Sequence, residues 1–89
     1  MTPERALGAV LRALREERRL SQEDLALDSG YSRYYVSLVE RGQRNATVRA
    51  LFHLARVLGT TPSEILRQTE ARVTALPPRQ HGDDPADVE

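Results

Sequence analysis

The chain has 89 residues, no cysteine and a formal net charge of zero, and all of its basic residues are arginines. The length fits one small domain, and without cysteine there can be no disulfide bond or thiolate metal site. No apolar run is long enough to span a bilayer and no signal peptide is present, so we expect a cytoplasmic protein.

Capping residues and apolar spacing mark the first two helices. Thr2 and Pro3 form a start signal, and the stripe that follows consists of Leu7, Val10, Leu11 and Leu14. Ser21 begins a second helix with an acid three residues later, which is a variant of the capping box. Its apolar positions are Leu25 and Ala26, and Gly30 ends it.

Three more helices follow. Ser32 caps the third, which carries Val36 and Val39 inward and ends at Gly42. Thr47 caps the fourth, which ends at Gly59 and whose apolar side consists of Val48, Leu51, Leu54, Ala55 and Leu58. A full capping box is predicted for the fifth, formed by Thr61 and Glu64. Its apolar pair is Ile65 and Leu66, and the pattern allows it to continue through Val73 to about Leu76.

The chain divides into a basic body and an acidic tail. Residues 1–76 contain twelve arginines and nine acids, a balance of +3, and we expect them to form one all-α domain. Residues 77–89 begin with two prolines and contain one arginine and four acids, a balance of −3. This segment is too polar to pack against a core, so we predict a disordered tail.

The short connection around Gly30 predicts a helix-turn-helix, in which Ala26 faces Val36 where the helices cross. In this context the chain resembles the Cro and phage-repressor (XRE) family. The resemblance covers residues 7–66 and rests on LSQEDLA (20–26), Gly30, ERG (40–42) and LARVLGTTPSEIL (54–66). It implies a five-helix lambda-repressor-like fold that binds double-stranded DNA.

The same resemblance implies that residues 32–41 form a recognition helix in the major groove. The predicted base-contacting residues are Arg33, Tyr34, Ser37, Leu38 and Arg44. The predicted contacts to the DNA backbone are Gln22, Ser32, Tyr35, Arg41, Gln43 and Asn45. Arginine can bind guanine O6 and N7 with two hydrogen bonds. Five arginines and one acid between residues 31 and 56 give the expected local positive charge.

Other residues in this region have structural interpretations. Tyr31 is expected to pack as a hydrophobic staple against Tyr35 or a neighbouring residue. Glu40 is expected to form a salt bridge with an arginine such as Arg15. His53 stands alone in its helix and is interpreted as a surface or interface residue rather than as a ligand.

Residues 33–37 and 40–45 also resemble the controller proteins of restriction–modification systems, which are small dimers that bind paired operators. Tyr34 and the Pro-Pro acidic tail depart from that pattern. The predicted function is therefore a transcriptional regulator that binds pseudo-palindromic operators as a homodimer. A restriction–modification controller is one form that such a regulator can take. The predicted dimer interface consists of Phe52, Leu66, Val73 and Leu76.

The alternative is a protein-interaction module such as an antitoxin, whose extension at residues 68–89 would bind a partner. The sequence shows no nucleophile–base pair, no phosphate loop and no paired carboxylates on an ordered element, so no enzyme activity is expected. His81, Asp83 and Asp84 are too few for a metal site. No cofactor, small-molecule ligand or membrane partner is predicted.

Overall fold

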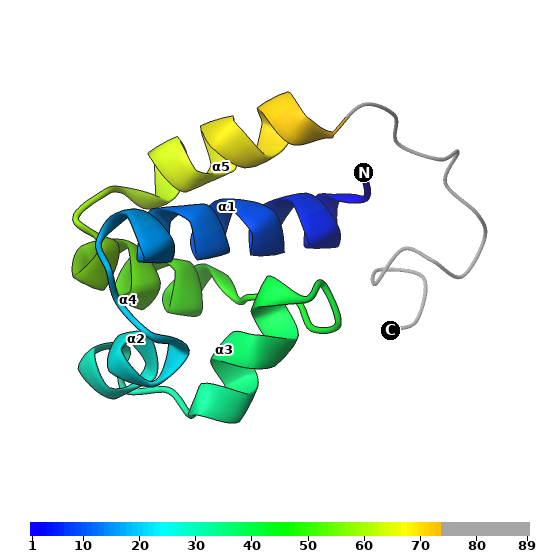
Figure 1. Cartoon of the computed structure of the whole chain (residues 1–89). Helices are drawn as coiled ribbons and strands as arrows, with labels where there is room; N and C mark the ends of the chain where they lie inside the picture. The colour runs from blue at the N-terminus through cyan, green and yellow to red at the C-terminus, as the bar shows by residue number, and fades with distance from the viewer. Residues whose placement is uncertain (74–89) are drawn as a thin grey trace.

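The computed structural model describes residues 1–73, which form five α-helices and contain no β-strand. The helices are α1 (Pro3–Glu17), α2 (Gln22–Ser29), α3 (Arg33–Glu40), α4 (Val48–Leu58) and α5 (Pro62–Arg72). Figure 1 shows α1 in the middle of the molecule, with α5 along one side and the other three helices on the opposite side. The predicted all-α architecture is confirmed. None of these five helices is long and apolar enough to cross a membrane.

Each helix begins at a hydroxyl side chain that accepts a hydrogen bond from a backbone N–H three residues later, and the caps are Thr2, Ser21, Ser32, Thr47 and Thr61. These are the predicted caps, because a hydroxyl oxygen satisfies one of the free N–H groups of the first turn. At α2 the box is complete: Asp24 also accepts from the Ser21 N–H at 3.0 Å, and these bonds lower the pKa of Asp24.

The full capping box predicted at α5 is wrong. Thr61 accepts from the Glu64 N–H, but the Glu64 carboxylate turns along the helix instead of back to the cap. It accepts two hydrogen bonds from Arg67, at 2.8 and 2.7 Å, and one from Gln68. These bonds, Arg67 first, lower the pKa of Glu64 to about 2. Two charge-assisted bonds to one guanidinium outcompete a single bond to the backbone.

The core joins all five helices, and its largest fully buried side chains are Leu11, Leu25, Leu54, Ile65, Val10 and Val39. One predicted core residue is misplaced, because Val48 is 72% exposed. It lies at the first position of α4, where the helix has barely begun to approach the core, and Ala50 and Leu51 are buried instead. Three buried polar residues were not anticipated: Arg15, Ser29 and Thr69. Ser29 and Thr69 donate to backbone carbonyls of their own helices.

The predicted continuation of the last helix through Val73 is also wrong. Helix α5 ends at Arg72, and Val73 caps it with extended backbone angles of φ −84° and ψ 107°. Leu76, the predicted boundary at residues 76 and 77, and the predicted tail at 77–89 lie outside the described residues.

Gly8 lets α1 approach the C-terminal end of α3 more closely than any other residue would. A Cβ built on Gly8 would lie 2.3 Å from the carbonyl oxygen of Glu40 and 2.5 Å from that of Val39. These distances are far below van der Waals contact, and the opposing atoms belong to backbone, which cannot rotate away. Gly8 therefore sets the depth at which α3 sits on α1.

Candidate nucleic-acid interface

The turn between α2 and α3 is held by Gly30 in a left-handed conformation, with φ +84°. The Ala26 carbonyl accepts from the N–H of Gly30 at 2.9 Å and from that of Tyr31 at 3.0 Å. Ala26 and Val36 are both buried in the core cluster, as predicted for this crossing. Helix α3 lies at the lower edge of the molecule in Figure 1. Val36 and Val39 point inward, whereas Arg33 and Tyr34 on its outer side are not covered by any other part of residues 1–73.

The outer face of α3 presents most of the predicted base-contacting residues. Arg33 and Tyr34 are exposed, and 69% of Tyr34 is accessible. Arg33 has no ion-pair partner among residues 1–73, so its guanidinium is available to a ligand. Ser37 and Leu38 are partly buried. A small hollow is lined by Gln22, Arg33, Tyr34 and Ser37, so α2 and α3 bring four predicted contact residues together.

Glu40 connects three helices beneath this face. Its carboxylate accepts two hydrogen bonds from Arg15 of α1, 2.7 Å from Nε and 3.0 Å from Nη2. The predicted salt bridge is therefore confirmed, and Arg15 also donates to the Leu20 carbonyl at 2.8 Å. The hydrogen bonds that Arg15 donates to Glu40 raise the pKa of Arg15, against the opposing effect of burial.

Gln22 is the third partner of Glu40. Its amide nitrogen donates to Glu40 Oε1 at 3.0 Å, which fixes the side chain at the start of α2. One amide hydrogen and the free N–H groups of the first turn remain for an anion. A residue predicted to contact the DNA backbone is thus positioned by the same carboxylate that holds α3.

A chain of ring contacts runs from α4 to the loop after α3. Tyr31 stacks on Tyr35 with ring centroids 4.9 Å apart, which confirms the predicted staple. The Tyr31 hydroxyl lies 3.1 Å from Nδ1 of His53, and this bond cannot be predicted from local spacing because the two residues are 22 positions apart. The Arg44 guanidinium lies 5.2 Å from the centre of the Tyr35 ring.

These contacts order two predicted DNA-contacting residues. A guanidinium over an aromatic face is attracted by the ring quadrupole, so Arg44 has a preferred position on an otherwise open loop. Burial raises the pKa of Tyr35. Since a tyrosine hydroxyl is already protonated at neutral pH, that of Tyr35 can donate to a phosphate oxygen.

The loop beyond α3 carries the other predicted backbone contacts, and Arg41, Gln43, Arg44 and Asn45 are all exposed. Gly42 ends the helix with φ +72°, and the Gln43 N–H donates to the Leu38 carbonyl at 2.9 Å. This closure fixes the start of the loop, so Arg41 and Gln43 lie beside α3. Ser32, the remaining predicted backbone contact, is exposed at the other end of the helix.

The predicted dimer residues lie on other faces. Phe52 of α4 is 60% exposed and Leu66 of α5 is 49% exposed, while Val73 is partly buried. Val48 lies one turn before Phe52 and extends the same apolar surface, which apolar spacing does not predict because it assigns Val48 to the core.

Comparison with known proteins places this arrangement among described families. A family model described as "Helix-turn-helix domain" matches residues 6–68. An uncharacterized HTH-type transcriptional regulator, y4dJ of Sinorhizobium fredii, is 39% identical over 70 residues, covering 79% of this chain and 91% of the relative. The control protein C.SmaI of Serratia marcescens is 42% identical over 60 residues, covering 67% of this chain and 71% of the relative.

Among solved structures, the restriction–modification controller protein C.AhdI of Aeromonas hydrophila superimposes with a TM-score of 0.67. It is 46% identical, and the match covers 68% of this chain and 92% of that protein.

Proposed function

The chain belongs to the helix-turn-helix domain family, and from this premise we propose that it regulates transcription by binding operator DNA as a homodimer. The relatives are named as a transcriptional regulator and as control proteins, which favours regulation over the antitoxin alternative. The observation that carries the proposal is the free outer face of α3, where Arg33 and Tyr34 are exposed beside Gln22.

In the proposed complex α3 lies in the major groove with its N-terminal end toward the base edges. Arg33 has the fork geometry that suits guanine, and Tyr34 presents a ring for a thymine methyl and a hydroxyl for a hydrogen bond. Gln22, Ser32, Tyr35, Arg41, Gln43 and Asn45 are proposed to bind phosphates and so fix the orientation of α3, while Ser37, Leu38 and Arg44 complete the base contacts.

One short helix reads only a few base pairs, so specificity requires a second copy. We propose a homodimer whose interface includes Phe52, Leu66, Val73 and Leu76. Phe52 on α4 and Leu66 on α5 support it, because exposed apolar side chains gain most from being covered. Two recognition helices then meet half-sites about one helical turn apart, ~34 Å. The sequence similarity to control proteins favours a restriction–modification controller as the specific role.

Binding selection from random duplexes tests this proposal. We expect enriched sequences to form a pseudo-palindrome whose half-site centres are about 10 base pairs apart. Sedimentation of the protein with and without the selected duplex should give a dimer on DNA. Enrichment of no sequence, or of an asymmetric single site bound by a monomer, would contradict the proposed mode.

Arg33→Ala should weaken binding to the selected site by ~1–3 kcal/mol and relax preference at one base pair, because a bidentate contact to guanine is lost. Titration of the cognate duplex and of its single-base variants measures both effects.

Arg44→Ala is the matched comparison, since it also removes one exposed arginine. If Arg44 contacts a base as proposed, its loss should relax preference at a different base pair. A uniform loss on all sequences, with a salt slope lower by about one, would mean that Arg44 binds the backbone instead. Equal losses on cognate and random DNA for Arg33→Ala would refute base reading by Arg33.

A further inference from the structure

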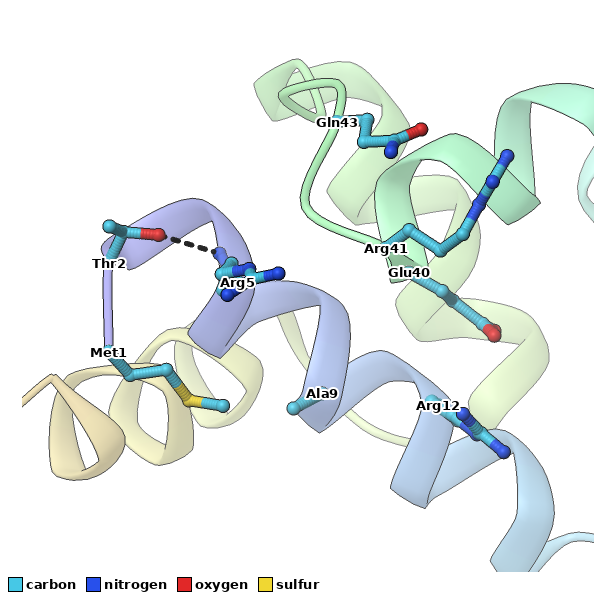
Figure 2. Close-up of a pocket in the computed structure, with 8 residues that line it drawn as sticks. All are labelled: Met1, Thr2, Arg5, Ala9, Arg12, Glu40, Arg41 and Gln43. Carbon is cyan, nitrogen blue, oxygen red and sulfur yellow. Dashed lines mark hydrogen bonds between the residues drawn. The ribbon is translucent and has the colours of Figure 1, made fainter.

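A groove of about 690 Å³ opens between the N-terminal half of α1 and the segment that follows α3. Figure 2 shows Arg5 and Arg12 projecting from α1 on one side of this groove, with Arg41 and Gln43 on the other. Met1 and Thr2 border it where the chain begins. The predicted DNA-contacting residues Arg41 and Gln43 thus share a groove with two α1 arginines that the proposed function does not use.

The groove is positively charged. Arg5 and Arg41 have no ion-pair partner among residues 1–73, and Arg12 pairs only with the exposed Glu16, at 3.2 Å. Glu40 is the acidic residue that borders the groove, but only 3% of its side chain is exposed and its carboxylate is bound by Arg15. Two guanidinium groups without an ion-pair partner, and a third paired only with an exposed acid, favour an anionic occupant.

The chain itself supplies an anionic segment close by. Helix α5 ends at Arg72, and Val73 and Pro3 line one common hollow, so the chain leaves the described part beside the start of α1 (Figure 1). The acids beyond that point are Asp83, Asp84, Asp87 and Glu89. Ten residues can span up to ~33 Å, whereas Pro3 and Arg12 are only ~14 Å apart along α1. The acidic segment can therefore reach the groove.

We propose that residues 83–89 bind this groove in the same molecule, with their carboxylates on Arg5, Arg12 and Arg41, and so compete with DNA for Arg41 and Gln43. Docking needs only the groove and the segment, whereas the competition rests on the proposed function. Because the segment is tethered, its effective concentration is high even if each ion pair is weak. The contact is electrostatic, so salt weakens it, and a tightly bound operator displaces it.

A spin label tests docking without DNA. Since the chain has no cysteine, Val88→Cys gives one labelling site and preserves every acid. At low salt the label should broaden the amide signals of Thr2, Arg5 and Ala9, and leave those of Leu27 and Arg56 sharp. At about 1 M salt, where the Debye length falls to ~3 Å, the selective broadening should vanish. Uniform broadening, or none, would overturn the proposal, as would broadening seen only between labelled and unlabelled copies in a mixed sample.

DNA titration tests the competition. Neutralising the segment by Asp83→Asn, Asp84→Asn, Asp87→Asn and Glu89→Gln should strengthen binding about fivefold or more at low salt, a usual size for coupling between two sites. In the groove variant Arg5→Gln/Arg12→Gln the same neutralisation should change affinity less than about twofold, because the docking site is gone.

The control for charge is Arg18→Gln/Arg56→Gln, which also removes two exposed arginines. Arg18 caps the other end of α1, ~20 Å from Arg5 along the helix. In this control the gain from neutralising the segment should persist. If the gain also persists in the groove variant, the segment acts by general repulsion and the proposal fails. Absence of any DNA binding would refute the proposed function, while the spin-label result would still decide whether the segment docks.

Discussion

Glu40→Gln is expected to lower the free energy of unfolding by about 3–5 kcal/mol, a large part of the 5–15 kcal/mol typical of a natural domain. The substitution keeps the shape of the side chain but leaves the Arg15 guanidinium without its counter-charge. Arg15 and Glu40 side chains are only 11% and 3% exposed, so water cannot replace the lost partner. The amide also turns a donor toward Arg15 or Gln22, both of which are donors themselves. Urea unfolding followed by circular dichroism measures the change.

Glu16→Gln is the matched control. It removes one carboxylate from an arginine pair of the same kind, Arg12–Glu16, which lies on the exposed side of α1. Exposed ion pairs contribute little to stability, so Glu16→Gln should lower the free energy of unfolding by less than about 1 kcal/mol. Arg15→Met/Glu40→Leu should be less destabilised than Glu40→Gln, because no buried charge is left unpaired. Equal effects of Glu40→Gln and Glu16→Gln would show that the Arg15–Glu40 pair does not hold α3 on α1.

Gly8→Ala is expected to destabilise the fold by about 3 kcal/mol, although the same change in an exposed helix is stabilising by up to about 1 kcal/mol. The added methyl group would collide with the carbonyl oxygens of Val39 and Glu40, so α1 and α3 must move apart. Thermal unfolding measures the loss. We also expect weaker operator binding by the folded protein, because the displacement tilts α3 relative to the loop that carries Arg41 and Arg44.

Gly30→Ala is the control for Gly8→Ala, because it tests the effect of backbone conformation without a steric clash. Gly30 has φ +84°, but a Cβ there would meet no atom within 4 Å. Its replacement should therefore lower the free energy of unfolding only by the backbone strain of a left-handed residue, about 1–2 kcal/mol.

A Gly8→Ala protein that melts at or above the temperature of the parent would mean that α1 and α3 are not in the close contact described.

Both predictions concern the same property, the position of α3. The Gly8 contact sets its depth on α1, and the Glu40 carboxylate fixes it to α1 and to the start of α2. Neither residue is proposed to touch DNA. The accuracy with which Arg33 and Tyr34 face a duplex nevertheless depends on both of them.

The sequence by itself determined the local structure. Caps such as Ser21 and Ser32 and terminators such as Gly30 and Gly59 act within one turn of the chain, so their effect can be read from neighbouring residues. Apolar spacing placed Val36 and Val39 inward and therefore Arg33 and Tyr34 outward. The motifs around these positions indicated the family.

Only the tertiary structure decided which residues far apart in the chain meet. The Tyr31–His53 bond, the Gly8 contact and the third partner of Glu40 depend on how helices cross, and spacing along one helix carries no such information. The Val48 error has the same origin, because Val48 lies beyond the edge of the core. The Glu64 error is local instead, because its carboxylate binds Arg67 and Gln68 within α5 rather than the cap. Local propensity fixes where a helix begins, whereas burial and side-chain pairing are fixed by what packs against it.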